Sequence, residues 1–162
     1  MRFRSLLLSI AAVLLSTALV RAEKPKSLVV WPGYILDVPP NHCIEARNGP
    51  DFHVLYVRDQ QSSTHAILAG IYLGFAPDFK PDCAKPATKT WSANGLSFKS
   101  VRGAGQCAEV LVQDPANAQR GYLHLWFGPG AKEHPQMAES LIASIRPAPL
   151  PLKDVLDPPA CK

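Results

Sequence analysis

Proline restricts the fold of this chain more than any other residue. All sixteen prolines come after residue 22, and they divide the rest of the chain into short pieces. Because proline fixes φ and lacks a backbone N–H donor, it ends or kinks a helix, and most of these pieces are too short for one. Strands are therefore predicted to be the main element. Short connections favour antiparallel pairing of strands that follow one another in the chain.

Turn residues predict two β-hairpins. Asn94-Gly95, the strongest short-range signal for a two-residue turn, separates segments 90–93 and 96–101. The second turn is 48–51, whose sequence is Asn-Gly-Pro-Asp. The other predicted strands, bounded by polar or Gly/Pro-containing turns, are 42–46, 52–58, 65–75, 106–113 and 121–127.

One helix is predicted, over residues 136–146. Its apolar residues recur at the three-and-four spacing that places side chains on one helix face: Ala138, Leu141, Ile142 and Ile145. Pro135 precedes this segment and Pro147 ends it. The expected fold class is α+β, with a twisted antiparallel β-sheet, arranged as a meander, and one C-terminal helix covering a face of that sheet.

The first 22 residues have the layout of a secretory signal peptide. A basic start is followed by an apolar run and by Val20-Arg21-Ala22, with small side chains at the first and third positions. The run is shorter than the roughly 20 residues needed to span a bilayer, so we expect no membrane anchor. Residues 23–146 are predicted to form a single β-rich domain in the periplasm or outside the cell, followed by a proline-rich tail, 147–162.

The charge distribution argues against a nucleic-acid partner. The net charge falls from +4 to +1 when the three arginines of residues 1–22 are removed. The remaining basic residues are scattered, and the nearest approach to a cluster is Lys80, Lys85 and Lys89. A protein that binds phosphate backbones would be expected to carry a basic stripe.

The four cysteines all follow the signal segment, at Cys43, Cys83, Cys107 and Cys161. An even number of cysteines in an oxidising compartment predicts two disulfides. No C-x-x-C pair is present, so a zinc ribbon or a thioredoxin-like redox site has no support. Of the three possible connectivities, we favour Cys83 with Cys107 and Cys43 with Cys161, because Cys161 lies in a proline-rich tail that needs an anchor.

No sequence motif indicates catalysis, a cofactor or a metal. The chain has no G-x-S-x-G elbow, no H-E-x-x-H pair and no Gly-rich phosphate loop. The histidines are isolated from one another and are interpreted as ordinary surface or edge residues: His42, His53, His65, His124 and His134. Asp51 and Asp78 each lie next to proline in a turn, where aspartate is favoured by local hydrogen bonds, rather than forming the paired acids of a hydrolase. We therefore assign no catalytic residue, cofactor or metal.

Strict alternation in residues 122–127 predicts two different strand faces. One face carries Leu123, Leu125 and Phe127, and the other carries Tyr122, His124 and Trp126. If the first set packs under the helix, the second lies on the outer face, where amphipathic aromatic residues favour binding. In the other interpretation both faces are buried, as in a sandwich or a barrel.

The long connection 76–89 is the second candidate for binding. A disulfide at Cys83 would hold its middle, and a tethered, proline-stiffened loop loses little entropy when it enters a partner's cleft. It is equally interpretable as a plain hairpin connection. Taken with the alternating strand, it gives the predicted partner-binding residues Asp78, Lys80, Asp82, Lys85, Tyr122, His124 and Trp126.

Several short motifs lie along residues 34–146, at 48–52, 70–74 with 77–79, 123–127 and 138–145. Together they resemble small periplasmic immunity proteins, which protect bacteria against secreted, type VI-like effectors that attack the cell wall. The resemblance implies a non-catalytic protein that blocks an enzyme's cleft. Periplasmic lysozyme inhibitors share that logic.

Two other classes of function stay open. A small periplasmic hydrolase would pair His124 with a carboxylate from another strand, such as Glu109 or Asp51. Ionisable side chains converging in a pocket would favour that class, whereas a looped or aromatic surface would favour binding. A structural subunit of an envelope assembly would instead show an unpaired sheet edge or a large apolar patch.

Overall fold

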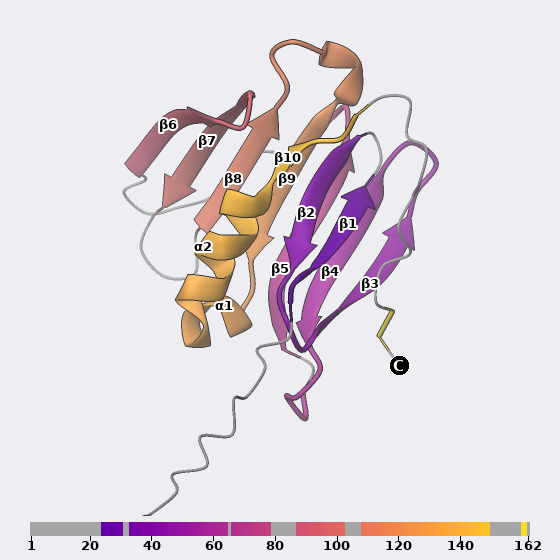
Figure 1. The fold of residues 1–162 in the computed structure, drawn as a ribbon, viewed down its shortest axis with the longest axis vertical. Helices are drawn as coiled ribbons and strands as arrows, with labels where there is room; N and C mark the ends of the chain where they lie inside the picture. The colour runs from indigo at the N-terminus through magenta and orange to yellow at the C-terminus, as the bar shows by residue number, and fades with distance from the viewer. Residues whose placement is uncertain are drawn as a thin grey trace, which may run out of the picture.

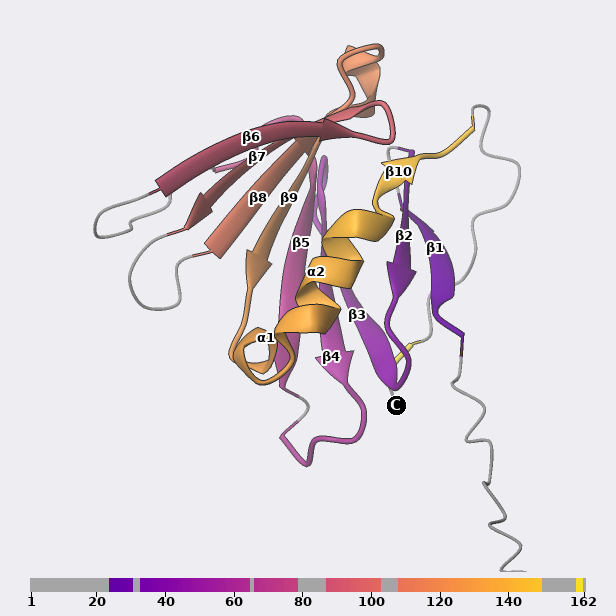
Figure 2. The ribbon, with the colours of Figure 1, turned by 60° about the vertical axis from the view of Figure 1, so that its left-hand side comes forward.

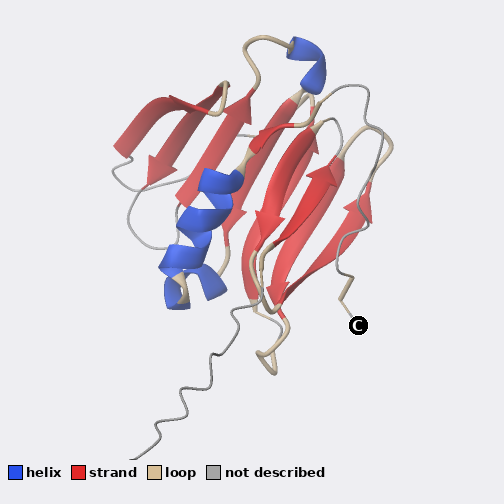
Figure 3. Ribbon diagram, in the orientation of Figure 1, coloured by secondary structure: helices blue, strands red, loops and turns tan. Residues whose placement is uncertain are grey.

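The computed structural model describes residues 24–30, 33–64, 66–78, 87–102, 108–149 and 160–161. The predicted signal segment 1–22 lies outside these ranges. So do several residues singled out by the sequence, namely His65, Lys80, Asp82, Cys83, Lys85 and Cys107. The described part consists of two antiparallel sheets and two α-helices, which confirms the α+β class (Figure 3).

Seven strands form the larger sheet, in the spatial order β3-β4-β5-β9-β8-β7-β6, and every neighbouring pair is antiparallel (Figure 1). In chain order the strands are β3 (His42–Asn48), β4 (His53–Asp59), β5 (Ile67–Gly74), β6 (Ala87–Ala93), β7 (Leu96–Arg102), β8 (Ala108–Gln113) and β9 (Tyr122–Phe127). All seven correspond to predicted strands, with ends that differ by a few residues.

The predicted sequential meander is wrong at one connection. β5 pairs with β9 and not with β6. The connection from β5 to β6 therefore runs from the middle of the sheet to its far edge. Six of the eight residues of β5 are buried, whereas β6 is polar and has no buried residue. A strand that is apolar on both faces gains most from neighbours on both sides, and a polar strand is tolerated at an edge.

Both predicted hairpins are confirmed. Asn94 and Gly95 have φ values of 53° and 77°, the left-handed values that a type I′ turn requires, and β6 and β7 pair on either side of them. In the other hairpin the Gly49 N–H donates to the Phe52 carbonyl at 2.9 Å, and β3 and β4 pair from this turn onward. Local turn chemistry therefore sets the strand order within each half of the sheet.

A second, three-stranded sheet was not anticipated from the sequence. It consists of β1 (Lys26–Val30), β2 (Tyr34–Val38) and β10 (Arg146–Pro147), in the order β1-β2-β10. Figure 2 shows this sheet and α2 on the same face of the larger sheet. Tyr34, Leu36 and Val38 alternate with less buried residues and point into the core, so the strand period of β2 was present in the sequence.

The C-terminal helix is confirmed with shifted ends. α2 (Pro135–Ser144) follows a short helix, α1 (Gly130–Glu133), and stops two residues before the predicted end. Ile145 is extended, and the following β10 pairs with β2. The helix face with Ala138 and Leu141 is buried against the core, together with Ile145.

Arg120 connects the turn before β9 to segments near the N-terminal and C-terminal ends of the domain, through contacts with Gly33 and Ala148. It ends a 3₁₀ helix, Ala118–Arg120, and its guanidinium Nε lies 2.6 Å from Asp114 Oδ2, an ion pair without the geometry of a hydrogen bond. The same guanidinium donates to the carbonyl of Gly33 and, at 2.9 Å, to the carbonyl of Ala148. Burial of this charge is thus compensated by three oxygen partners.

The proline-rich tail is tied back to β3 by one of the two predicted disulfides. Cys43 and Cys161 are bonded, as predicted, and the Cys161 N–H donates to the Ile44 carbonyl at 3.3 Å. The predicted Cys83–Cys107 bond lies outside the described residues. Within the described ranges, no helix is long and apolar enough to cross a membrane.

Candidate functional site

The two faces of the larger sheet differ, and the hydrophobic core lies on one of them. α2 and the β1–β2 hairpin lie against that face, and no described element lies on the other (Figure 2). In β9 the side chains of Leu123 and Leu125 are 0% exposed and belong to the core. Tyr122, His124 and Trp126 therefore share the opposite face, as the alternation predicts, and on that face Tyr122 and Trp126 are half-buried and His124 is buried.

The strand register brings further aromatic residues to this face. Tyr72 lies directly opposite His124, and both Tyr56 of β4 and Trp126 of β9 flank Gly70 of β5. Directly opposed residues share a face of an antiparallel sheet. We call the set Tyr56, Tyr72, Tyr122, His124 and Trp126 the outer aromatic face. Its tyrosines and tryptophan are half-buried, whereas His124 is only 7% exposed.

Gly70 makes room for the tryptophan at the centre of the face. A Cβ atom added at Gly70 would lie 2.1 Å from the indole of Trp126, so the ring lies over the backbone of β5. Tyr56 meets Trp126 edge-on, with ring centroids 6.2 Å apart. Aromatic contacts of this geometry stabilise by about 0.5 to 1.5 kcal/mol beyond area burial. A glycine inside a strand is a sequence signal for such a close approach, although it does not say which side chain approaches.

Charged residues border the outer aromatic face on β3 and β4. Two guanidinium groups, those of Arg47 and Arg58, lie 5.4 and 5.7 Å from the ring centroid of Tyr56. Both also pair with Glu45, at 2.9 and 2.7 Å. Hydrogen bonds from Arg47 and then Arg58 hold the pKa of Glu45 below its usual value. Sequence reasoning did not find these residues because only the strand register brings them beside Tyr56.

A depression of about 490 Å³ opens beside Trp126. Its lining comes from three strands and the start of the connection after β5: Tyr72, Ala76, Asp78, Ala108, Glu109, His124, Trp126 and Phe127. His124 Nε2 lies 2.9 Å from Glu109 Oε2. Three predicted partner-binding residues, Asp78, His124 and Trp126, therefore meet here, and Tyr122 lies on the same face.

The described lining of the depression supplies an acid–base pair, His124 with Glu109. A histidine beside a carboxylate is able to act as a base, and the described lining also includes the carboxylate of Asp78 and the phenol of Tyr72. The described residues that line the depression include no serine, threonine or cysteine. Asp51, the other carboxylate considered for His124, is exposed in the β3–β4 turn and does not line it.

The other described histidines lie elsewhere, and no metal centre is formed in the described part of the chain. His42 Nδ1 lies 2.9 Å from the Pro40 carbonyl, and His53 Nδ1 lies 2.7 Å from Asn48 Oδ1. No group of three or more metal-ligating side chains occurs among the described residues.

No protein-family model matches this chain, and no match was found among curated proteins or solved structures.

Proposed function

We propose that this chain is an exported, non-catalytic binding protein whose outer aromatic face blocks a periplasmic toxin or a cell-wall hydrolase. The observation that supports it most directly is the outer sheet face, on which no described helix or strand lies and which carries Tyr56, Tyr72, Tyr122 and Trp126. Large aromatic side chains with a polar tip dominate the energetics of many protein interfaces. Export is supported by the signal-like segment 1–22.

The face is also rigid and bordered by charge, which suits a protein partner. Its aromatic residues stand on a seven-stranded sheet, and Trp126 contacts both Tyr56 and His124, so these three side chains lose little conformational freedom on binding. Arg47 and Arg58 lie at one side, and Asp78 and Glu109 lie at the depression. An apolar centre with a charged rim is the usual anatomy of a specific interface.

A hydrolase is the second candidate, and the 2.9 Å contact between His124 and Glu109 favours it. In that function His124 would act as a general base, Glu109 would orient its ring, and the depression would hold the substrate. In this proposal water is the nucleophile, activated by His124 as it enters the depression.

Capture from periplasmic extract with matched variants tests the binding proposal. Leu111 is half-buried on the outer face opposite His124, whereas Gln136 is exposed on α2. We expect the wild type and the control Gln136→Arg to retain the same wall-degrading enzyme, and Leu111→Arg to lose it while its melting temperature stays close to that of the wild type. The retained enzyme should lose activity on cell-wall material when the wild type is added.

Two results would contradict this function. Retention of the same proteins by Leu111→Arg and by the wild type would remove the outer face from the interface. Hydrolysis of cell-wall material by the purified chain alone, abolished in a folded His124→Gln variant, would replace the binding function with the hydrolase.

A further inference from the structure

The covered face of the larger sheet contains a groove that the proposed function does not use. α2 packs mainly against β2, and the strands β6, β7 and β8 lie to one side of the helix (Figure 2). Two adjoining cavities of about 270 and 720 Å³ lie there. Both are lined by Ser100, Val110 and Ile142, among others, so together they form one groove along α2, which we call the inner groove.

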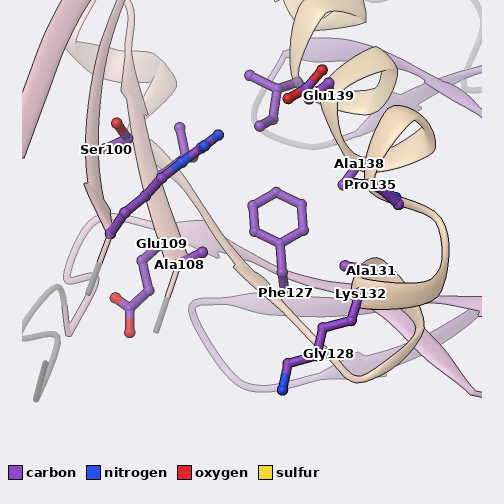
Figure 4. Close-up of a pocket in the computed structure, with 13 residues that line it drawn as sticks. Ser100, Ala108, Glu109, Phe127, Gly128, Ala131, Lys132, Pro135, Ala138 and Glu139 are labelled. Atoms are coloured by element: carbon purple, nitrogen blue, oxygen red, sulfur yellow. The ribbon is translucent and has the colours of Figure 1, made fainter. Parts of the chain in front are cut away.

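Apolar side chains form the length of the inner groove. Phe127 lies between the strand residues and the two helices at one end (Figure 4). At the other end Trp91 stacks on Phe98, with ring centroids 5.0 Å apart and planes inclined by 13°. Ile142 of α2 is only partly buried, which leaves an apolar wall on the helix side. The size and the apolar lining are those of a small-molecule site.

The charges at the groove are mostly positive. Lys89, Arg102 and Lys132 line it, against Glu139 on α2. Glu109 also contributes to the lining, but its carboxylate points away from Phe127 and pairs with His124 (Figure 4). Arg102 and Lys132 form no ion pair with any described residue. Both cations line the smaller cavity, where the buried hydroxyl of Ser100 also lies.

We propose that the inner groove binds an anionic amphiphile: an apolar chain with a carboxylate or phosphate head. The head would lie in the smaller cavity beside Arg102, and Lys132, whose ammonium group points away from Phe127 (Figure 4), would lie at the rim of the site, since unpaired cations at a partly apolar site favour an anion. The chain would extend along α2 past Ile142 to the Trp91–Phe98 stack. α2 has ten residues and is therefore about 15 Å long, a length that suits a medium acyl chain.

Titration of the purified mature protein, without reducing agent, tests the proposal. Dodecanoate is the anionic probe and dodecyltrimethylammonium is the cationic probe with the same chain, both below the concentrations at which they form micelles. We expect dodecanoate to bind at one saturable site and the cation to bind at least tenfold more weakly. A lysophosphatidylglycerol with the same chain distinguishes a lipid from a free fatty acid as the preferred source of the head group.

Variants place the ligand in the groove. Arg102→Ala with Lys132→Ala should weaken dodecanoate binding at least tenfold, because both exposed cations line the cavity that would take the head group. The matched control, Lys24→Ala with Lys26→Ala, removes two exposed lysines near β1 and should leave the affinity unchanged. Ala143→Trp, at an exposed position that lines the larger cavity, should block the chain. Thermal melts verify that each variant is folded.

Three outcomes would overturn the proposal. They are no saturable binding of either anionic probe, equal affinity for the anionic and cationic probes, and unchanged affinity in the folded Arg102/Lys132 variant. Since none of these variants alters the outer aromatic face, retention of a hydrolase by the same proteins reports on the proposed function separately.

Discussion

Tyr34 links the stability of the fold to alkaline pH. Its side chain is 0% exposed and its hydroxyl donates to the Gly121 carbonyl at 2.9 Å. Burial raises the pKa of Tyr34 from 10.0 to about 12, because the phenolate is disfavoured in the core. The folded-state pKa is the higher one, so this contribution to stability is fully present below pH 10 and is lost as the pH rises toward 12. The difference corresponds to roughly 2 to 3 kcal/mol of unfolding free energy.

Replacing Tyr34 by phenylalanine should therefore flatten the alkaline part of the stability curve. At pH 8 the unfolding free energy of Tyr34→Phe should be lower than that of the wild type by about 1 to 3 kcal/mol, because the Gly121 carbonyl loses its hydrogen-bond donor. Urea unfolding at a series of pH values from 8 to 12 measures both effects. Tyr72→Phe, on the outer aromatic face, is the matched control and should retain the fall shown by the wild type. An equal fall in Tyr34→Phe and in the wild type would assign the pH dependence to other groups.

Gly70 leaves space for the indole ring of Trp126, and the substitution Gly70→Ala, which adds one methyl group, tests this role. The Cβ of Gly70→Ala would meet the indole at 2.1 Å, so the ring has to move, at an expected cost of about 1 to 3 kcal/mol. We expect a lower melting temperature together with a change in the near-ultraviolet circular dichroism of the aromatic residues. Gly95→Ala is a useful comparison because it meets no atom within 4 Å but has a positive φ of 77°. It should lower stability through backbone strain and leave the aromatic signal unchanged.

At the level of elements, what the sequence predicts depends on how far apart the interacting segments lie. The Asn94-Gly95 hairpin and the α2 segment were predicted because their signals are local. The pairing of β5 with β9 was missed, since the period of a strand identifies its faces but not its neighbours. The candidate site divides in the same way. Alternation within β9 placed His124 and Trp126 on one face, whereas Tyr56 and Tyr72 join them only through the register of three strands.

The contribution of α2 is testable at its buried face. Leu141 is 0% exposed in the core, so Leu141→Ala should lower the unfolding free energy by about 2 to 5 kcal/mol. Glu139 is exposed on the same helix, and Glu139→Ala should change stability by less than about 0.5 kcal/mol. Urea denaturation of the two variants compares them directly. Similar small effects would mean that the helix is peripheral to the core.

For the whole molecule, the layered arrangement leaves two different surfaces on one sheet. The β1–β2 hairpin and α2 cover one part of the inner face of the larger sheet. The inner groove lies beside α2, where β6, β7 and β8 form the sheet. The opposite side carries the outer aromatic face. Because β8 and β9 contribute side chains to both surfaces, a ligand in the groove and a partner on the outer face would contact the same two strands.

The disulfide between Cys43 and Cys161 closes almost the whole domain into one loop. The two cysteines are 118 residues apart in sequence, and on the chain-entropy model a loop of this length stabilises the fold by about 5 kcal/mol. Cys43→Ala with Cys161→Ala should therefore lower the unfolding free energy by several kcal/mol, as measured by urea unfolding of unreduced protein. Thiol labelling of the denatured, unreduced wild type should detect no free cysteine. The double variant retains only Cys83 and Cys107. Labelling of two thiols in the unreduced double variant would show that these two cysteines are not bonded to each other. A double variant as stable as the wild type would mean that residues 160–161 stay on β3 without the covalent link. The backbone contacts of Ile44 with Ala160 and Cys161 would then hold them there.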